Sequence, residues 1–400
     1  MSNYDLVVVG AGTGGLAAAS LASKTGKKVL VLDPSERPGG VLAGIRKKDF
    51  LFYPGPFLSF GVDRDGPLQQ LVASLGISQA ASLRSPCYQV AFPDRRITVF
   101  AEPAETLEEL RREFPREIDT IARFYQNLHK VAAGTTRSRL KLFLTRLRSA
   151  SGFLRSYRFS PEFTAFLNVQ SYYFFHRPLT ALNLRSLVML CDVPPFTLTC
   201  GFGHLAEEMA AVLVKAGGEI RLGQDLSQLT VYPHRLFLGK SQIDCRNILL
   251  NTDQRERIVV CTGVRDEVMP VGMETEILEV PGYDLQDQFM TISISGRTED
   301  IQASKGMRAI TTVLGRSRKD QSPETVATRL REIIPFLDDF SVFKEESVHA
   351  SRPHAFAGKV KGWPATLLRK TSVKSVFVLP DGASAMESAV AARSFVQHLK

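Results

Sequence analysis

The first forty residues alternate between apolar runs and short polar breaks, a pattern that predicts a strand, a turn, a helix and a second strand. Residues 4–9 form a β-branched apolar run of the kind found in buried parallel strands. Residues 16–24 are alanine-rich and contain no proline, so they are predicted to be helical, and residues 28–32 form the second apolar run.

The rest of the chain carries further predicted elements. Residues 106–134 are typical of a helix broken near Pro115 and ended by Gly134. A helix over 204–216 stops at two glycines and is followed by four short strands. Residues 324–337 predict another helix, and residues 375–399 predict a strand, a turn and a helix.

Three glycines, Gly10, Gly12 and Gly15, lie in the predicted turn between the first strand and the helix. The first can take a positive φ, the second has no side chain to block a pyrophosphate, and the third lets the helix pack closely on the strand. Asp33 ends the second strand, where an acid binds a ribose 2′-hydroxyl and repels a 2′-phosphate. The stretch predicts a dinucleotide site that disfavours NADP. On the motif alone, NAD, FAD and an ordinary glycine-rich turn stay open.

Composition is ordinary for a soluble globular protein: 400 residues, 44% hydrophobic and 23% charged, long enough for two or three structural domains. No apolar stretch approaches the roughly 20 residues that cross a bilayer, and the start lacks the basic region of a secretion signal. The histidines and cysteines show no metal-binding spacing, so we expect no metal, no disulfide framework and a cytoplasmic location. The five cysteines are Cys87, Cys191, Cys200, Cys245 and Cys261.

Four blocks, in this order, resemble the phytoene desaturase family of FAD-dependent oxidoreductases, within the amine-oxidase-like flavoproteins that include carotenoid isomerases and retinol saturase. The blocks cover residues 7–40 (VVVGAGTGGLAAASLASKTGKKVLVLDPSERPGG), 50–61 (FLFYPGPFLSFG), 200–253 (CGFGHLAEEM to NILLNTD) and 373–395 (VKSVFVLPDGASAMESAVAARSF). The second glycine pair of the first block, after the ribose acid, marks FAD more than NAD in that family. The resemblance therefore implies FAD as the cofactor.

The resemblance also implies roles for single residues. The glycine turn, Asp33 and the second glycine pair would hold the pyrophosphate and the adenine ribose, and Leu226 would offer backbone groups to the adenine. Asp381 would bond the ribityl chain or the pyrophosphate, and the helix from about Met386 would point its dipole at the flavin ring. The implied cofactor-binding residues are Gly10, Gly12, Thr13, Gly14, Gly15, Asp33, Gly40, Val41, Leu226, Asp381 and Met386.

The chain departs from the family pattern at two positions. Val41 stands where the family has arginine, and Pro380 stands where it has glycine. Both changes weaken phosphate and flavin contacts, so altered redox chemistry or a degenerate enzyme stays open.

The resemblance implies oxidation, reduction or isomerisation of carbon–carbon double bonds in a long apolar isoprenoid such as a carotenoid. Two alternatives remain: an amine oxidase, disfavoured because the carboxy-terminal block has no aromatic pair to cage an amine, and a flavin-binding protein without turnover. The sequence names no catalytic residue. In the run QSYYFFHRP, His176 and Arg177 follow four aromatics, which is typical of a core segment with a polar end. The other interpretation is an aromatic wall for a polyene.

The chain carries a net charge of +9, but it has no nucleic-acid recognition motif, so we expect no nucleic-acid partner. Residues 136–159 contain no acid and have leucine and phenylalanine at near-helical spacing between the basic residues. This pattern is typical of an interfacial helix on the inner face of a membrane, and equally of a solvated helix packed on the core. The basic residues are Arg137, Arg139, Lys141, Arg146, Arg148, Arg155 and Arg158.

Together these patterns predict an α/β fold with a doubly wound, Rossmann-type FAD-binding domain and an inserted α+β substrate domain. We expect the FAD domain to comprise residues 1–70, 190–255 and 350–400, and the substrate domain residues 71–189 and 256–349. The sequence indicates no oligomeric state.

Overall fold

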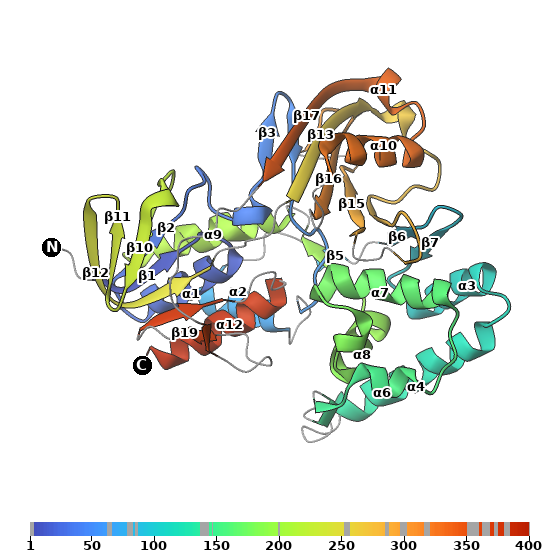
Figure 1. Cartoon of the computed structure of the whole chain (residues 1–400), viewed down its shortest axis with the longest axis horizontal. Helices are drawn as coiled ribbons and strands as arrows, with labels where there is room; N and C mark the ends of the chain where they lie inside the picture. Colours follow the sequence, from blue (N-terminus) through green and yellow to red (C-terminus); the bar gives the residue numbers. More distant parts are fainter. Residues whose placement is uncertain are drawn as a thin grey trace.

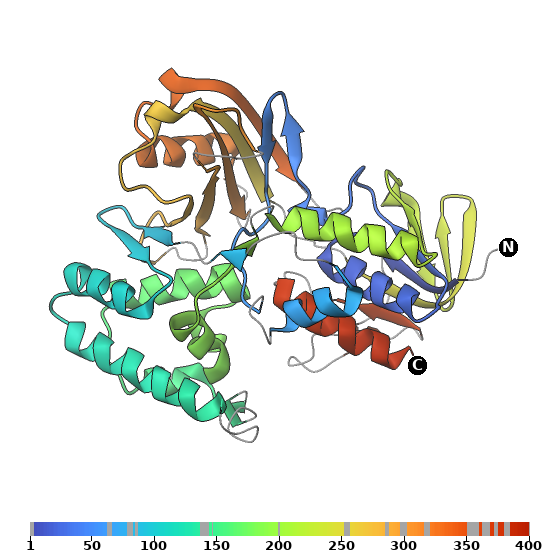
Figure 2. The same cartoon turned by 180° about the vertical axis from the view of Figure 1, so that it is seen from behind.

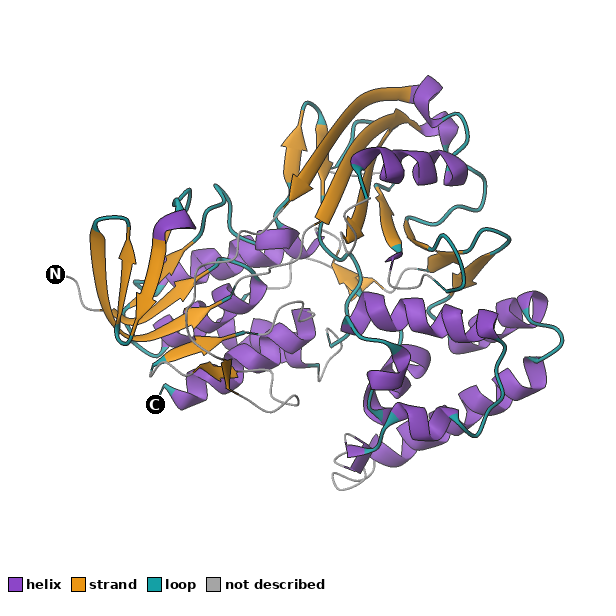
Figure 3. Cartoon of the chain, in the orientation of Figure 1, coloured by secondary structure: helices purple, strands orange, loops and turns teal. Residues whose placement is uncertain are grey.

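The structure is a computed structural model, which describes residues 4–61, 66–77, 83–84, 87–136, 144–145, 147–198, 201–251, 257–284, 288–296, 302–315, 321–349, 360–361, 369–371, 375–379 and 385–399. Three bodies are visible in Figure 1: a mixed strand and helix unit, a second sheet with its own helices, and a block of helices. Figure 3 shows that the third body is helical, whereas the second is mainly strand.

The first body is built on a sheet whose central strands β9, β2, β1, β12 and β20 are parallel and come from the start, the middle and the end of the chain. One face of the sheet packs against the helices, as Figure 2 shows from behind. The opposite face carries the β10–β11 hairpin. Its elements are β1 (Tyr4–Val9), α1 (Thr13–Lys24), β2 (Val29–Leu32), α2 (Pro67–Leu75), α9 (Gly201–Lys215), β9 (Glu219–Arg221), β10 (Leu229–Tyr232), β11 (Arg235–Leu238), β12 (Ser241–Leu250), β18 (Val360–Lys361), β19 (Arg369–Thr371), β20 (Val376–Val378) and α12 (Ala385–His398).

Apolar alternation explains this layering. In β1, Leu6 and Val8 face the helices, whereas Val7 and Val9 face the hairpin, and all four are fully buried. The predicted strands and helices at both ends of the chain are present, and α9 and the four strands after it follow as expected. Helix α2 packs on α1 and α12, so this body continues past residue 70. The other domain boundaries stay a prediction.

The second body is a sheet in the order β17-β13-β16-β15-β14-β6-β7, antiparallel except for the β14–β6 pair. Helices α10 and α11 cover one face, and Phe50 and Phe52 of the β3–β4 hairpin cover part of the other. Its elements are β3 (Ile45–Lys47), β4 (Phe50–Phe52), β6 (Tyr88–Ala91), β7 (Arg96–Val99), β13 (Arg257–Arg265), β14 (Glu276–Glu279), β15 (Met290–Ile294), β16 (Met307–Gly315), α10 (Pro323–Ile333), α11 (Leu337–Phe340) and β17 (Ser341–His349).

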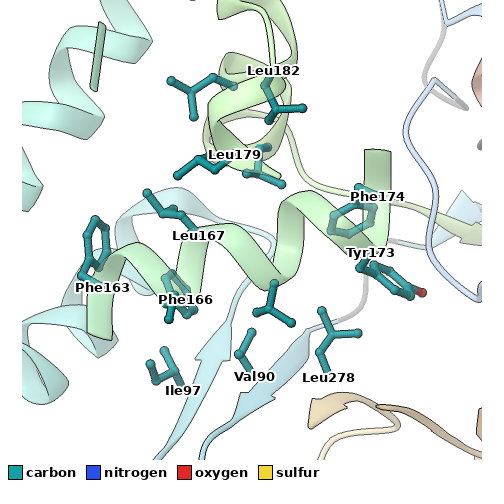
Figure 4. Close-up of a cluster of buried hydrophobic side chains, with 14 of the residues drawn as sticks. Val90, Ile97, Phe163, Phe166, Leu167, Tyr173, Phe174, Leu179, Leu182 and Leu278 are labelled. Atoms are coloured by element: carbon teal, nitrogen blue, oxygen red, sulfur yellow. The ribbon is translucent and has the colours of Figure 1, made fainter. Parts of the chain in front are cut away.

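The third body packs its helices on β6, β7 and β14 through an aromatic core (Figure 4). Helix α7 is its centre: the Ser160 hydroxyl caps its start, and His176, with φ 54°, ends it. Phe163, Phe166 and Phe174 of α7 are buried in this core. The helices of this body are α3 (Pro103–Glu113), α4 (Ile118–Thr136), α6 (Ala150–Leu154), α7 (Pro161–Phe175), α8 (Leu184–Asp192) and the short 3-10 helix η2 (Leu179–Ala181). The other elements of the chain are the strand pair β5 (Leu83–Arg84) and β8 (Thr197–Leu198), and the 3-10 helices η1 (Gly40–Leu42), η3 (Leu226–Gln228) and η4 (Asp266–Val268).

Two sequence predictions were wrong in this body. Gly134 does not end α4, which runs on to Thr136. Residues 136–159 are not one helix, because Ser149 caps a new helix, α6, and Leu154 and Phe159 pack against the aromatic core. Residues 137–143 and 146 of that segment lie outside the described residues. No helix in the described part of the chain is both long and apolar enough to cross a bilayer.

Candidate functional site

The glycine turn between β1 and α1 is tightly enclosed by backbone. Gly10 has φ +107°, and a Cβ there would lie 2.0 Å from the Asn251 carbonyl oxygen, so only glycine fits. A Cβ on Gly15 would lie 2.2 Å from the Gly10 oxygen, which explains the close packing of helix on strand. Thr13 begins α1, and Gly14 and Gly15 are buried in its first turn. No side chain caps α1, and no acid lies in its first turn, among the residues described. The helix therefore starts with backbone N–H groups suited to an anion.

Asp33, 5% exposed, follows β2 and is bonded to the same turn. Its Oδ2 accepts a 2.5 Å hydrogen bond from the Ala11 N–H, and its Oδ1 accepts one of 2.8 Å from the Ser35 N–H. Each carboxylate oxygen keeps a second acceptor site, so the acid can also bind a ribose hydroxyl. The side chain that the sequence assigned to the ribose thus lies beside the phosphate turn.

Asn251 is a site residue that sequence reasoning did not single out. It follows β12, the parallel neighbour of β1, and its N–H donates to the Val9 oxygen at 2.8 Å. Its side-chain Nδ2 lies 2.9 Å from the position that a Cβ would take on Gly12 or on Gly15. The sequence could have indicated Asn251, because the residue follows a predicted strand, and the carboxyl ends of neighbouring parallel strands meet at one edge of a sheet, where ligands bind.

The second glycine pair lies directly against the first turn. The Gly39 N–H donates to the Ala11 oxygen at 2.8 Å, and a Cβ on Gly40 would lie 3.2 Å from the Gly12 Cα. Val41 follows in η1 and is exposed, so this edge of the turn carries an apolar side chain where the family has a cation. A phosphate bound at this turn would therefore meet backbone N–H groups rather than an arginine at this position.

Leu226 follows the loop after β9, and this loop is bonded to Asp33 and Ser35. The Gln224 N–H donates to the Asp33 oxygen, and the Gly223 N–H donates to the Ser35 oxygen, both at 3.0 Å. Leu226 begins η3 two residues later, and its side chain is buried. Met386 lies in α12, which packs along α1. Asp381 and Pro380 lie outside the described residues.

A second glycine-lined contact joins the first body to the residues after β4. A Cβ on Gly55 would lie 2.5 Å from Leu42 Cδ2, and a Cβ on Gly203 would lie 2.5 Å from the Leu42 oxygen. Tyr53 and Phe57 complete this junction, where the space between side chains is about 10 Å³. Such a space is close to the minimum for one water molecule, so the residues described leave no open cavity at this point.

The other candidate groups of the sequence have structural roles. In QSYYFFHRP, Gln170, Tyr173 and Phe174 are buried, whereas His176 and Arg177 at the end of α7 are exposed, so the run is a core segment with a polar end. Within the described part of the chain, no group of histidine, cysteine and acidic side chains could hold a metal ion. Cys87, Cys191, Cys245 and Cys261 are free thiols, and Cys200 lies outside the described residues.

The sequence of the chain is similar to a known domain family and to several known proteins. Residues 8–75 match the family model described as an NAD(P)-binding Rossmann-like domain. The chain is 27% identical over 283 residues to a chloroplastic prolycopene isomerase of Daucus carota, a match that covers 62% of this chain and 46% of that relative. It is 27% identical over 249 residues to the phytoene desaturase (neurosporene-forming) of Rhodobacter capsulatus, covering 56% and 47%. Over part of its length the chain is thus similar to proteins named as a prolycopene isomerase and a phytoene desaturase. It spans about half the length of these two relatives.

Solved structures establish the fold. An oxidoreductase from Methanosarcina mazei superposes with a TM-score of 0.65 at 15% identity, over 98% of this chain and 99% of that one. Cyclohexylamine oxidase from Brevibacterium oxydans superposes with a TM-score of 0.62 at 14% identity, over 100% of both chains. The fold is α/β with a Rossmann-type unit, as the sequence predicts. Fold and relatives together indicate a flavin or nucleotide cofactor.

Proposed function

We propose that the chain binds FAD and acts as an oxidoreductase on the carbon–carbon double bonds of a long apolar isoprenoid. The observation that carries the proposal is the bond between Asp33 and the glycine turn, which brings the ribose acid and the start of α1 to one place. The names of the relatives support the substrate class.

The residues present fit the ADP half of FAD. Gly12 presents no side chain at the start of α1, where a Cβ would lie 2.9 Å from Asn251 Nδ2, so a pyrophosphate would meet the backbone N–H groups of the turn. Asp33 has free acceptor sites for the ribose, and the loop before Leu226 lies beside it. A 2′-phosphate would meet the Asp33 carboxylate, so we propose FAD rather than NADP.

Bound FAD would supply the transfer of an electron pair or a hydride. The residues of the chain would position the substrate and keep water away from it. Leu42, Tyr53, Phe57 and Phe202 line the junction after β4, where the enclosed space is about 10 Å³, so a bound ring system would need this junction to open.

We also propose that residues 136–159 contact the inner surface of a membrane, from which an apolar substrate would enter. Leu144 is 46% exposed and Leu147 is 68% exposed, and the neighbouring Arg148 and Arg155 are exposed as well. Such a surface suits the boundary between acyl chains and anionic headgroups.

The test is a turnover assay with the FAD-loaded full chain and carotenoids in detergent micelles. We expect the polyene absorption and the chromatographic profile to change with the wild type, and to stay unchanged with Gly12→Val, which fills the pyrophosphate space. An unchanged polyene together with flavin bleaching by a primary amine would contradict the proposal and favour the amine oxidase alternative.

A further inference from the structure

The glycine turn lies where the order of strands in the first sheet changes direction. In the order β9-β2-β1-β12-β20, the chain continues from β1 to β2 on one side, and later adds β12 and β20 on the other. Open parallel sheets bind ligands at such a point, in the crevice outside the carboxyl ends of the strands. The turn therefore has a strand end on each side, with Asp33 after β2 and Asn251 after β12.

Asn251 is held against the turn through its backbone. Its N–H donates to the Val9 oxygen at 2.8 Å, and its own oxygen lies 2.0 Å from the place that a Cβ would take on Gly10. These two contacts fix the backbone of Asn251 beside the turn. The side chain therefore reaches the turn from a defined starting point.

The carboxamide of Asn251 presents its donor end to the turn. Nδ2 lies 3.5 Å from the Gly10 oxygen, a long hydrogen bond, and 2.9 Å from the place of a Cβ on Gly12 or on Gly15. In the reversed orientation the amide oxygen would face the Gly10 oxygen, and two acceptors would repel each other. An amide nitrogen carries two N–H donors, and the Gly10 oxygen engages one of them. The second N–H is therefore available to a ligand at the turn.

The two residues that flank the turn differ in chemistry. Asp33 brings a carboxylate, which accepts hydrogen bonds and repels a phosphate. Asn251 brings a neutral amide, which can donate to a phosphate oxygen without adding a negative charge. Val41, in the second glycine pair's segment, brings no cation that could do the same.

Resting on the proposed function, we propose that Asn251 is a binding residue for the diphosphate of the dinucleotide. Its free Nδ2 N–H donates to a phosphate oxygen over Gly12, where the absence of a side chain lets a diphosphate approach. The ligand is thus divided between the two strand ends, with its ribose at Asp33 and its diphosphate at Asn251.

Titrations of the full chain with FAD and with ADP test this role. In Asn251→Ala we expect about ten- to hundredfold weaker binding of both ligands, the usual effect of one lost hydrogen bond to a charged group. Asn247→Ala is the matched control, because Asn247 of the same strand donates to the Asp5 oxygen of β1 at 3.4 Å, at the end of β12 away from the turn. We expect wild-type affinities in the control. Wild-type affinities in Asn251→Ala would overturn the proposal.

Asn251→Asp separates contact with the diphosphate from support of the turn. Both substitutions remove the bond to the Gly10 oxygen, but the aspartate also places a negative charge beside the phosphates. We expect ADP binding roughly tenfold weaker than in Asn251→Ala at about 0.1 M salt, and a smaller gap at about 1 M salt, where charges are screened. Equal losses in the two variants at both salt concentrations would assign Asn251 to the turn alone and overturn the proposal.

Phosphorus NMR of bound FAD keeps the proposal testable if Asn251→Asp does not fold. At saturating FAD, we expect the two diphosphate resonances to shift in Asn251→Ala relative to the wild type, and to stay in place in Asn247→Ala. Unshifted resonances in Asn251→Ala would overturn the contact.

ADP separates this proposal from the proposed function, because it carries the diphosphate without a flavin. Wild-type protein that binds ADP but not FAD, with ADP binding weakened in Asn251→Ala, would overturn the proposed function and leave the role of Asn251 intact. Equal FAD affinity in the wild type and Asn251→Ala would overturn the role of Asn251 alone. Wild-type protein that binds neither ligand would overturn both.

Discussion

The carboxylate of Asp33 is bonded to the backbone N–H of Ala11 at 2.5 Å, across 22 residues of chain. The acid at the end of β2 therefore stabilises the glycine turn before any ligand is bound. A ribose would use the acceptor sites that remain on the same two oxygens.

Replacing this acid affects both the turn and the ligand. We expect Asp33→Ala to weaken FAD binding by roughly 1–3 kcal/mol, the scale of a lost hydrogen bond to a charged group. Because the Ala11 and Ser35 N–H groups also lose their acceptor, the melting temperature should fall even without FAD. Asp33→Asn keeps an acceptor, so we expect smaller losses of FAD affinity and of melting temperature than in Asp33→Ala. Equal FAD affinity in the wild type and Asp33→Ala, measured by fluorescence titration, would count against a role for Asp33 in the ribose site.

Gly12 gives a sharper test of the pyrophosphate site. Gly12→Val adds a branched side chain at a position where a Cβ alone would lie 2.9 Å from Asn251 Nδ2, so it fills the space over the turn. We expect FAD binding to be lost by equilibrium dialysis. The control is Gly152→Ala, because a Cβ on Gly152 meets no atom within 4 Å. Retained FAD binding by a folded Gly12→Val protein would show that the pyrophosphate does not lie at Gly12.

The first body could be predicted well from the sequence, because its apolar alternation and its glycine turn are patterns of residues that are close together in the chain. The buried network in which the Tyr173 and Ser293 hydroxyls donate to Glu276 could not be predicted in this way. Tyr173 and Glu276 are 103 positions apart, and the Leu58 N–H, which donates to the Tyr173 hydroxyl, is 115 positions away from it. Only the register of β14, β15 and β16 brings Glu276, Ser293 and Thr311 into one row.

The prediction that residues 136–159 form one helix was wrong for a related reason. Helical spacing of apolar residues does not distinguish a single long helix from two short ones. Here the Ser149 hydroxyl accepts a hydrogen bond from the Ser151 N–H and caps the start of α6, and Leu154 of this helix packs against the aromatic core. Membrane contact at this segment stays a prediction that rests on Leu144 and Leu147.

The buried acid predicts a specific pH dependence of stability. The pKa of Glu276 is about 8 in the fold and about 4.5 in the unfolded chain, so folding takes up a proton between these pH values. Stabilisation from this group is complete below pH 4.5 and is lost as the pH rises to about 8, by up to about 1.4 kcal/mol per pH unit. Glu276→Gln removes this dependence.

Urea unfolding of both proteins from pH 5 to pH 9 gives the difference in unfolding free energy. We expect Glu276→Gln to gain stability relative to the wild type as the pH rises to 8, and no further change above it. A constant difference would mean that Glu276 is ionised in the fold.

The exposed leucines predict lipid binding. Leu144→Ser with Leu147→Ser should weaken sedimentation with anionic liposomes without lowering the melting temperature, because both side chains are exposed. Arg148→Gln with Arg155→Gln should remove about 2 kcal/mol, at about 1 kcal/mol per basic residue, and reduce the salt dependence. Neutral liposomes are the control. Wild-type protein that stays in the supernatant with anionic liposomes at low salt would refute membrane contact here.

The most direct test of the central claim is an equilibrium titration of the purified full chain with FAD, followed by absorbance, with NADPH in a parallel titration. The glycine turn, the open start of α1 and Asp33 predict a yellow protein that binds about one FAD per chain, and no measurable affinity for NADPH. A correctly folded, colourless protein that does not bind added FAD would contradict the account.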